Sequence, residues 1–247
     1  MLDQPSALRA RSVARVSIMT TLVFIVTAVF SLYIPQTRGY FNIGEAAVYI
    51  SALILNPIQA WIAGGVGSMM ADVALGYFYY APATLIIKGC EAAIASTLVR
   101  RKPRSRILES RLVGTGFSML LPLLIGLIGS RFYVGSVELS FSIPLTPLLT
   151  IGIGELAQWT WVVIAIIIAA FLVYTNLKRV GTSWTILSLT TSGMVMVLGY
   201  YLYEQLVLGV AAIAEVPFNL MQVLVGITAC LMVEEALKPF SRLVAQQ

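Results

Sequence analysis

Four short clusters of aromatic, amide and charged residues interrupt an otherwise apolar chain, and their side chains are of the types that bind a small polar molecule. The clusters lie at residues 40–45, 77–91, 200–204 and 215–222. Aromatic faces, amide groups and opposite charges together suit a flat heteroaromatic ligand with polar edges. The side chains that we predict to bind it are those of Asn42, Glu45, Tyr80, Lys88, Glu91, Tyr200, Glu204, Asn219 and Gln222.

Helical spacing brings some of these residues together, but each cluster also has a purely structural interpretation. Lys88 and Glu91 are three residues apart, and Tyr200 and Glu204 are four apart, so each pair shares one helical face. Tyrosines near helix ends often form the aromatic belt at the membrane surface. Amides such as Asn219 can join neighbouring helices, and Lys88 with Glu91 can be a structural ion pair.

Signatures of catalysis are absent from the sequence. The chain has no histidine, the commonest general base and metal ligand. It has no Gly-x-x-x-x-Gly-Lys-Ser/Thr phosphate loop and no His-Glu-x-x-His, Gly-x-Ser-x-Gly or Cys-x-x-Cys motif. Cys90 and Cys230 fall inside predicted membrane spans, so we expect buried thiols. We predict no catalytic residues, no metal site, no cofactor and no ATP hydrolysis by the chain itself.

Composition indicates that these clusters belong to a membrane protein. The 247 residues are 59% hydrophobic and 11% charged, whereas about a quarter of residues are charged in soluble domains. Long apolar runs between turns and charges predict an all-α, polytopic membrane helix bundle with eight spans. They cover residues 13–34, 43–56, 58–76, 82–100, 112–130, 148–176, 184–208 and 217–237. The second is short for a full crossing.

Basic residues predict the orientation of these spans. If the N-terminus is cytoplasmic, thirteen of the sixteen Lys and Arg residues fall in cytoplasmic segments, the exceptions being Arg38, Lys88 and Arg131. Lys and Arg gather on the cytoplasmic side of membrane proteins. We therefore expect a multi-pass protein of the cell (plasma) membrane with both termini cytoplasmic. Most acidic residues then fall in the outer half, which predicts a polar pocket there.

Small residues recur along the third predicted span. One series is Ala60, Gly64, Ser68, Asp72 and Gly76, and a second series, Ala63, Gly67 and Ala71, runs beside it. Small side chains let helix backbones approach closely in a lipid bilayer. We expect this face to pack inside the bundle, with Asp72 held by Lys88 of the next span.

Several of these segments resemble a known family. The chain is similar to the substrate-specific (S) components of energy-coupling factor (ECF) transporters, and among them to the riboflavin-type group. In the first half the resemblance lies in FNIGEAAV (41–48), AGGVGS (63–68), YAPAT (80–84) and IKG (87–89). In the second half it lies in GYYLYE (199–204), EVP (215–217) and QVLVG (222–226). The similar parts cover residues 40–100 and 190–238.

The resemblance implies a mechanism and partners. S components bind a vitamin, a vitamin precursor or a metal ion at an outward-facing site. They then associate with a membrane-embedded T component and two ATP-binding cassette (ABC) ATPases, and are thought to topple in the membrane to release the ligand. The family contacts the T component through an Ala-x-x-x-Ala pattern in the first helix. Its nearest equivalents here are Ala14, Ser17 and Thr21.

The chain has more predicted spans than the six helices typical of that family. Spans one to four and seven to eight match the six. We therefore expect a single membrane domain, residues 1–247, with a six-helix core at about 13–100 and 184–238. The two extra transmembrane helices form an inserted hairpin at about 107–180, which either covers the pocket or contacts a partner.

These features predict the substrate-binding membrane subunit of an ATP-driven ECF-type importer for a vitamin or vitamin precursor, riboflavin-like or another small heteroaromatic. The sequence does not identify the ligand, and no contact with nucleic acid is expected. Two alternatives stay open. One is a stand-alone or ion-coupled transporter in which the extra hairpin replaces the partners. The other is an intramembrane enzyme that uses the outer carboxylates.

Overall fold

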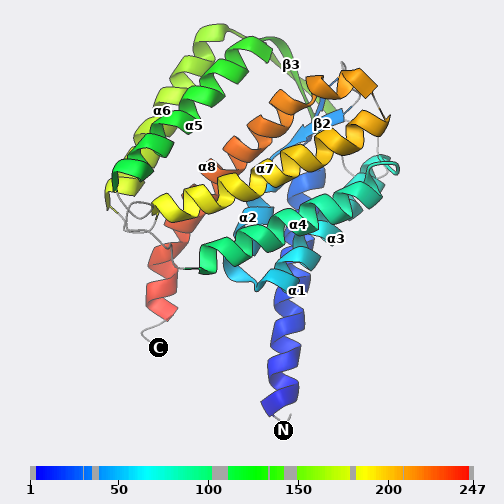
Figure 1. Cartoon of the computed structure of the whole chain (residues 1–247), viewed down its shortest axis with the longest axis vertical. Helices are drawn as coiled ribbons and strands as arrows, with labels where there is room; N and C mark the ends of the chain where they lie inside the picture. Colours follow the sequence, from blue (N-terminus) through cyan, green and yellow to red (C-terminus); the bar gives the residue numbers. More distant parts are fainter. Residues whose placement is uncertain are drawn as a thin grey trace.

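Helices dominate the protein, as the computed structural model in Figure 1 shows. The structure describes residues 4–29, 31–34, 39–101, 111–132, 134–141, 149–178, 182–207 and 209–244. The α-helices are α1 (Gln4–Val29), α2 (Gly44–Ile54), α3 (Pro57–Leu75), α4 (Ala81–Arg100), α5 (Arg111–Phe132), α6 (Gln158–Lys178), α7 (Thr182–Val207) and α8 (Val216–Val244). A 3-10 helix, η1 (Gly209–Ala214), precedes α8. The predicted all-α, polytopic bundle is confirmed.

Seven helices in the described part of the chain are long and apolar enough to cross a membrane. The eighth, α2, has 11 residues and is about 16 Å long at 1.5 Å per residue. The hydrocarbon core of a bilayer is about 30 Å thick. The predicted span at residues 43–56, already short for a full crossing, is therefore a short helix with most of its residues buried, and its length alone does not cross the hydrocarbon core.

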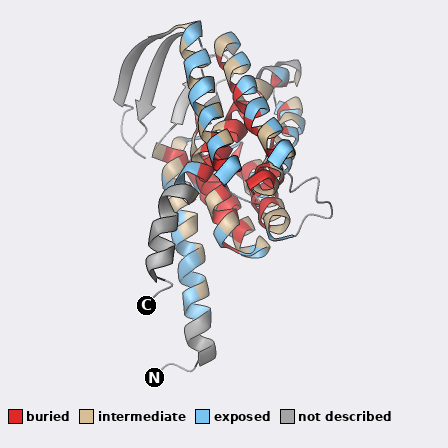
Figure 2. Ribbon diagram, turned by 90° about the vertical axis from the view of Figure 1, so that its left-hand side faces the viewer, coloured by how far each residue is buried: buried red, intermediate tan, exposed pale blue. Residues whose placement is uncertain are grey.

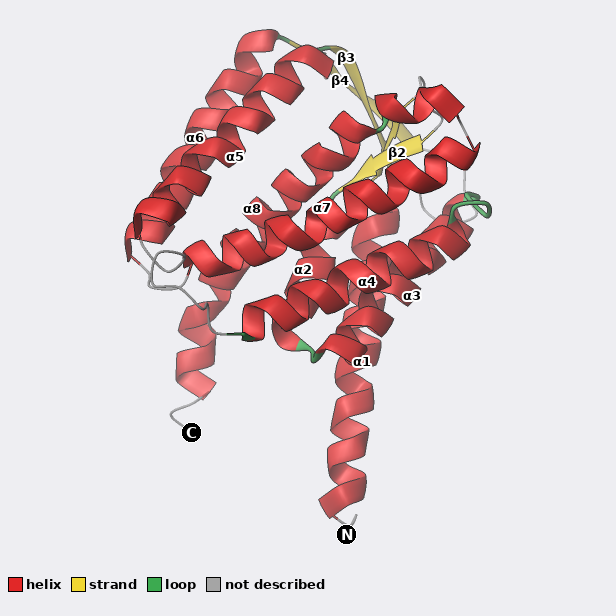
Figure 3. Ribbon diagram, viewed as in Figure 1, coloured by secondary structure: helices red, strands yellow, loops and turns green. Residues whose placement is uncertain are grey.

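Two antiparallel β-hairpins, which the sequence did not predict, lie at the end of the bundle opposite to the start of α1 and the end of α8 (Figure 3). Strand β1 (Ser31–Ile34) pairs with β2 (Gly39–Asn42), and β3 (Gly135–Phe141) pairs with β4 (Leu149–Leu156). The first predicted span therefore ends at Val29, and the sixth begins at Gln158. Alternating isoleucine and glycine at residues 151–154 favour a strand over a helix.

Helix α3 packs between α1 and α4 through its small residues. A Cβ atom on Gly64 would lie 2.8 Å from Cβ of Ala92 on α4, and one on Gly67 would lie 2.7 Å from the backbone oxygen of Thr20 on α1. Gly76 has a different role, because it is exposed and ends α3 in the left-handed conformation with φ of 87°. Internal packing of the predicted small-residue face is thus confirmed, apart from Gly76.

Replacing Gly67 by Ala should destabilise the fold, because the added methyl group meets Thr20 and also lies 2.8 Å from Cβ of Val23. Overpacking of this kind costs about 1–3 kcal/mol, and we expect a lower melting temperature of the detergent-purified protein. Gly116 of α5 is the matched control, since no described atom lies within 4 Å of a Cβ placed there. Equal melting temperatures for Gly67→Ala and Gly116→Ala would contradict the close contact between α1 and α3.

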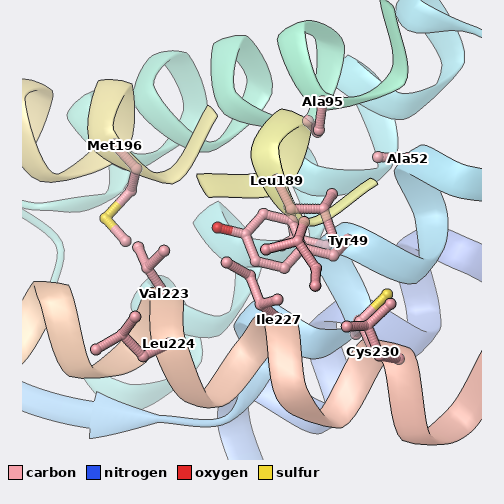
Figure 4. Close-up of a cluster of buried hydrophobic side chains, with 14 of the residues drawn as sticks. Tyr49, Ala52, Ala95, Leu189, Met196, Val223, Leu224, Ile227 and Cys230 are labelled. Atoms are coloured by element: carbon pink, nitrogen blue, oxygen red, sulfur yellow. The ribbon is translucent and has the colours of Figure 1, made fainter. Parts of the chain in front are cut away.

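Helices α2, α4, α7 and α8 enclose the main apolar core. Helix α7 packs on α4 and α8, and α8 packs on α2. Figure 4 shows the fully buried Tyr49 of α2 in one cluster with Leu189 of α7 and Ile227 of α8. Buried residues concentrate on the inner faces of these helices, whereas much of α1 is exposed (Figure 2). Cys230 is buried as predicted, and Cys90 is half-buried.

Helices α5 and α6 pack against each other along their length (Figure 1). Helix α5 also contacts α7 and α8. Asn176 ties one end of the pair to α7. It donates to the backbone oxygen of Arg111 at 3.1 Å and to Oγ1 of Thr115 at 3.2 Å, and it accepts from Oγ of Ser183 at 3.0 Å. This pair occupies the segment predicted to form a helical hairpin.

Candidate functional site

A polar pocket lies where the ends of α1, α3 and α7 meet the starts of α2, α4 and α8. It contains about 580 Å³ of space that no protein atom occupies, including its opening to solvent. Its wall is formed by Thr27, Asn42, Gly44, Glu45, Val48, Ser68, Asp72, Tyr77, Tyr80, Thr84, Lys88, Tyr200, Glu204, Glu215, Asn219 and Gln222. Six helices from distant parts of the chain therefore contribute to one site.

Eight of the nine residues predicted to bind a ligand line this pocket. The ninth, Glu91, is fully buried behind Lys88, one helical turn further along α4. Its carboxylate accepts hydrogen bonds from Lys88 Nζ at 3.3 Å and from the hydroxyl of Tyr49 at 3.0 Å. Glu91 therefore supports a residue of the wall and does not itself form the wall.

Lys88 joins α2 to α4 through buried ion pairs. Its ammonium group pairs with Glu45 of α2 and with Glu91 of its own helix. It also lies 5.8 Å from the ring centre of Tyr200 on α7, within the range of a cation–π interaction. Asp72, the expected partner of Lys88, lines the same pocket from α3, but the salt bridges of Lys88 are with the two glutamates. One cation thus holds three helices at the pocket.

A cluster of tyrosines surrounds Glu204 at the side of the pocket formed by α7. The ring of Tyr80 lies 6.4 Å from that of Tyr200 and 5.7 Å from that of Tyr203. Its hydroxyl donates to Oε1 of Glu204 at 3.4 Å. Burial and the nearby carboxylates of Glu204 and Glu215 raise the pKa of the Tyr80 phenol well above its usual value, so Tyr80 stays a neutral hydrogen-bond donor.

Acidic residues outnumber basic residues among the described residues of the wall. Glu45, Asp72, Glu204 and Glu215 line the pocket, and each is at most 5% exposed. Among the described residues of the wall, Lys88 alone is basic. Within the part of the chain that the structure describes, no three or more His, Cys, Asp or Glu residues converge to hold a metal ion. The acids are therefore spread around the wall.

Several buried polar atoms of the wall have no hydrogen-bond partner among the described residues. They are Oγ1 of Thr27, Oε1 of Glu45, Oε2 of Glu204 and Nδ2 of Asn219. Buried polar groups in proteins normally have such partners. All four residues line the pocket.

The first turn of α2 forms one wall of the pocket. The side chain of Asn42 accepts a hydrogen bond from the backbone nitrogen of Gly44 at 2.8 Å, which fixes the entry into the helix. Gly226 of α8 lies directly against Glu45, since a Cβ atom on Gly226 would be 2.5 Å from Cβ of Glu45. The absence of a side chain at Gly226 thus allows α8 to approach α2 where Glu45 meets Lys88.

Eight further residues line the pocket that were not among the predicted ligand contacts. Asp72, Tyr77 and Glu215 belong to the small-residue series or to the polar clusters already singled out. Thr84 precedes Lys88 by four residues and lies on the same helical face. This spacing could have indicated that Thr84 lines the pocket. Thr27 lies in an apolar run of α1, where nothing in the sequence marks it.

The three residues proposed to contact a T component lie on the outer surface of α1. Ala14, Ser17 and Thr21 are all exposed. They lie apart from the pocket, and the opposite side of α1, with Thr20 and Val23, packs against Gly67 of α3. The predicted partner surface is therefore accessible along the helix.

Comparisons with known proteins agree with this architecture. The family model described as "ECF-type riboflavin transporter, S component" matches residues 7–143, more than half of the chain. A curated protein of Pyrococcus woesei, the "Uncharacterized protein in gap 3'region", is 40% identical over 72 residues, or 29% of this chain. The chain spans about half the length of that relative, 48%. No solved structure gives a significant match. By the family match, the chain belongs to the S components of ECF-type riboflavin transporters.

Proposed function

We propose that this protein is the substrate-binding membrane subunit of an ATP-driven ECF-type importer, and that its pocket captures a vitamin or vitamin precursor. The main support for this proposal is that eight of the predicted ligand-binding residues line one pocket, in a chain that belongs to this family. The tyrosines and amides of the pocket suit a riboflavin-like or another small heteroaromatic molecule.

Energy for import would come from partners, since the chain has no phosphate-binding loop. We propose a membrane-embedded T component and two ABC ATPases in this role. The pocket would load from one side of the membrane, and the assembled complex would release the ligand on the other.

The proposed orientation has both termini in the cytoplasm. In support, the start of α1 and the end of α8 lie at the same end of the bundle (Figure 1). The basic residues Arg100 and Arg101 follow at the end of α4, and Arg111 opens α5. The pocket lies at the opposite ends of these helices, which would face the outside.

The division into a six-helix core and an inserted α5–α6 hairpin is also a proposal. It is supported by packing, because α5 and α6 contact each other far more extensively than they contact the remaining helices. The family match extends through α5 and so does not separate the hairpin from the core. The proposed boundary is therefore supported by helix packing alone.

A bulky side chain on the exposed face of α1 should block transport without weakening ligand binding. We expect Ser17→Trp to reduce ATP-dependent uptake in proteoliposomes by about tenfold or more, since a large group there would disrupt a docked interface. Ile18→Trp is a matched control on the same helix, because Ile18 is exposed but not among the small residues of the proposed interface. Equal uptake by Ser17→Trp and wild type would place the T component elsewhere.

Ligand identification tests the proposed function directly. Mass spectrometry of protein purified in mild detergent should reveal a small heteroaromatic molecule that rebinds with micromolar or tighter affinity. Uptake of that molecule into proteoliposomes should then require the T component, both ATPases and ATP. Uptake by this chain alone would instead favour a stand-alone or ion-coupled transporter, and absence of any bound vitamin-like compound would contradict the proposal.

A further inference from the structure

Many of the side chains that line the pocket are shielded from solvent. Thr27 of α1, Ser68 of α3 and Asn219 of α8 belong to the wall, and each is at most 7% exposed. A molecule large enough to contact all three must therefore displace part of what covers them. The β1–β2 hairpin is placed for this covering role, because both of its ends lie at the pocket.

The β1–β2 hairpin begins and ends beside the pocket wall. Thr27 lies four residues before β1, and Asn42 both ends β2 and lines the pocket. Strand β2 also contacts α1 and α8, the helices that carry Thr27 and Asn219. The hairpin thus bridges these two helices at the pocket, and it must move if a molecule enters from that side.

The second feature is the β3–β4 hairpin, which joins α5 to α6. Outside its own hairpin, β3 makes its main contact with β1. In Figure 3, β3 and β4 run from the end of α5 and the start of α6 towards β2. A β-bulge lies between Val137 and Glu138, and bulges bend the strand that contains them. None of the described residues of α5 or α6 lines the pocket, so this pair of helices reaches the covering hairpin through β3.

The α5–α6 pair is a firm support for β3. A Cβ atom on Gly126 of α5 would lie 3.2 Å from Cβ of Ala165 of α6, and Gly129 packs directly against the indole of Trp161. At the other end of the pair, Asn176 forms hydrogen bonds with both α5 and α7. Close packing and a buried amide therefore hold the two helices together and fix them to the rest of the bundle.

The contact between β1 and β3 can open without breaking a sheet. Strand β1 pairs with β2 and β3 pairs with β4, so in the described part of the chain the two hairpins form separate two-stranded sheets. Separation of the hairpins leaves both hydrogen-bonded ladders intact. Segments that are joined by few interactions open at a low cost in free energy.

We propose that the α5–α6 pair works through β3 as a strap, which holds the β1–β2 hairpin over the pocket and sets how readily the pocket opens. Of the two roles open for this extra segment, covering the pocket or contacting a partner, the strap is the first. This role goes beyond the proposed import function, because access to the pocket can be measured without knowing the bound molecule.

Thiol labelling inside the pocket tests the strap on the detergent-purified protein. Cys90 and Cys230 are first replaced by Ala, and Ser68→Cys then places a single reporter thiol in the pocket wall. Replacement of residues 135–156 by a short Gly-Ser linker removes the strap, and the linker can join α5 to α6 because the two helices pack along their length.

Removal of the strap should expose the reporter thiol. We expect a small methanethiosulfonate reagent to label position 68 at least about tenfold faster, since reaction at a buried site follows the population of the open form. Lys178→Cys, at the exposed end of α6, is the control and should be labelled at the same rate with and without the strap.

A reversible cross-link tests the same contact with the chain intact. Cysteine pairs, one in β1 (31–34) and one in β3 (135–141), are oxidised in the reporter background, and the pair that forms a disulfide most completely is kept. The disulfide should slow labelling at position 68 by about tenfold, because it keeps the covering hairpin in place. Reduction should restore the original rate, and peptide mass spectrometry separates labelling at position 68 from labelling of the pair.

The cross-link decides the matter even if the shortened protein does not fold. Labelling that is unchanged by oxidation, or failure of every pair to form a disulfide, would overturn the strap. Labelling at the original rate in a folded shortened protein would overturn it equally. None of these results bears on the proposed function, which ligand identification tests separately.

Discussion

Lys88→Met should be among the most damaging single substitutions in this protein. It removes the only ammonium group that pairs with Glu45 and Glu91 in the described part of the chain, and both carboxylates are at most 1% exposed. Breaking a buried ion pair from one side typically costs about 3–5 kcal/mol, because the remaining charge is left without a partner. We expect a large fall in the melting temperature of the detergent-purified protein and loss of ligand binding.

A triple variant distinguishes the structural from the binding contribution of Lys88. Combining Lys88→Met with Glu45→Gln and Glu91→Gln removes the uncompensated charges, so thermal stability should largely return while ligand binding stays lost. Lys178→Met, at the exposed end of α6, is the matched control and should have little effect. If Lys88→Met melts and binds like the wild type, Lys88 does not organise this pocket.

Gly226→Val should separate α8 from α2 and displace Glu45. The new Cβ would lie 2.5 Å from Cβ of Glu45, 2.7 Å from its Cγ and 3.2 Å from its backbone carbonyl carbon. Since backbone as well as side-chain atoms are in the way, a rotamer change cannot relieve the overlap. We expect a cost of about 1–3 kcal/mol from overpacking and a further loss of ligand affinity, because Glu45 can no longer meet Lys88.

Melting temperature and ligand affinity, measured on the same preparation, check this prediction. Gly116→Val is the control, because Gly116 is also a helical glycine but has open space around it. Intrinsic helix propensity changes equally in both variants, so the difference between them reports the contact with Glu45. Identical behaviour of the two variants would show that α8 does not lie this close to α2.

Lys88 shows how far the sequence could predict the site. Its spacing to Glu91 on one helix placed the two charges together, and their atoms are 3.3 Å apart. The other partner was predicted to be Asp72 but is Glu45, which lies on a different helix. The period of an α-helix fixes neighbours along one helix, whereas neighbours across helices depend on tertiary packing that no spacing in the sequence records.

The remaining site residues follow the same logic. Glu204, Asn219 and Gln222 could be singled out because polar residues within apolar helices are costly and therefore conspicuous. Thr27 could not, because a threonine in a membrane helix often bonds to its own backbone and carries no signal of a cavity.

The sequence predicted the long apolar helices correctly but did not predict the β-hairpins at their outer ends. Hydropathy depends only on composition over about twenty residues, which is why seven spans were found close to their observed positions. Strands β1 and β4 lie within the predicted spans 13–34 and 148–176, and α2 is as apolar as a membrane span but is shorter than a full crossing. Apolarity alone could not separate these cases.

The buried network around Lys88 would also limit the route of the proposed ligand. Behind it, towards the ends of α2 and α4, lie Ala52 and Ala95 in a tightly packed apolar cluster with Tyr49 (Figure 4). A molecule in the pocket would have to break the network and part several helices to travel on through the bundle. Under the proposed function, entry and exit would therefore share one mouth, and the compartment that this mouth faces would decide whether the ligand is loaded or delivered.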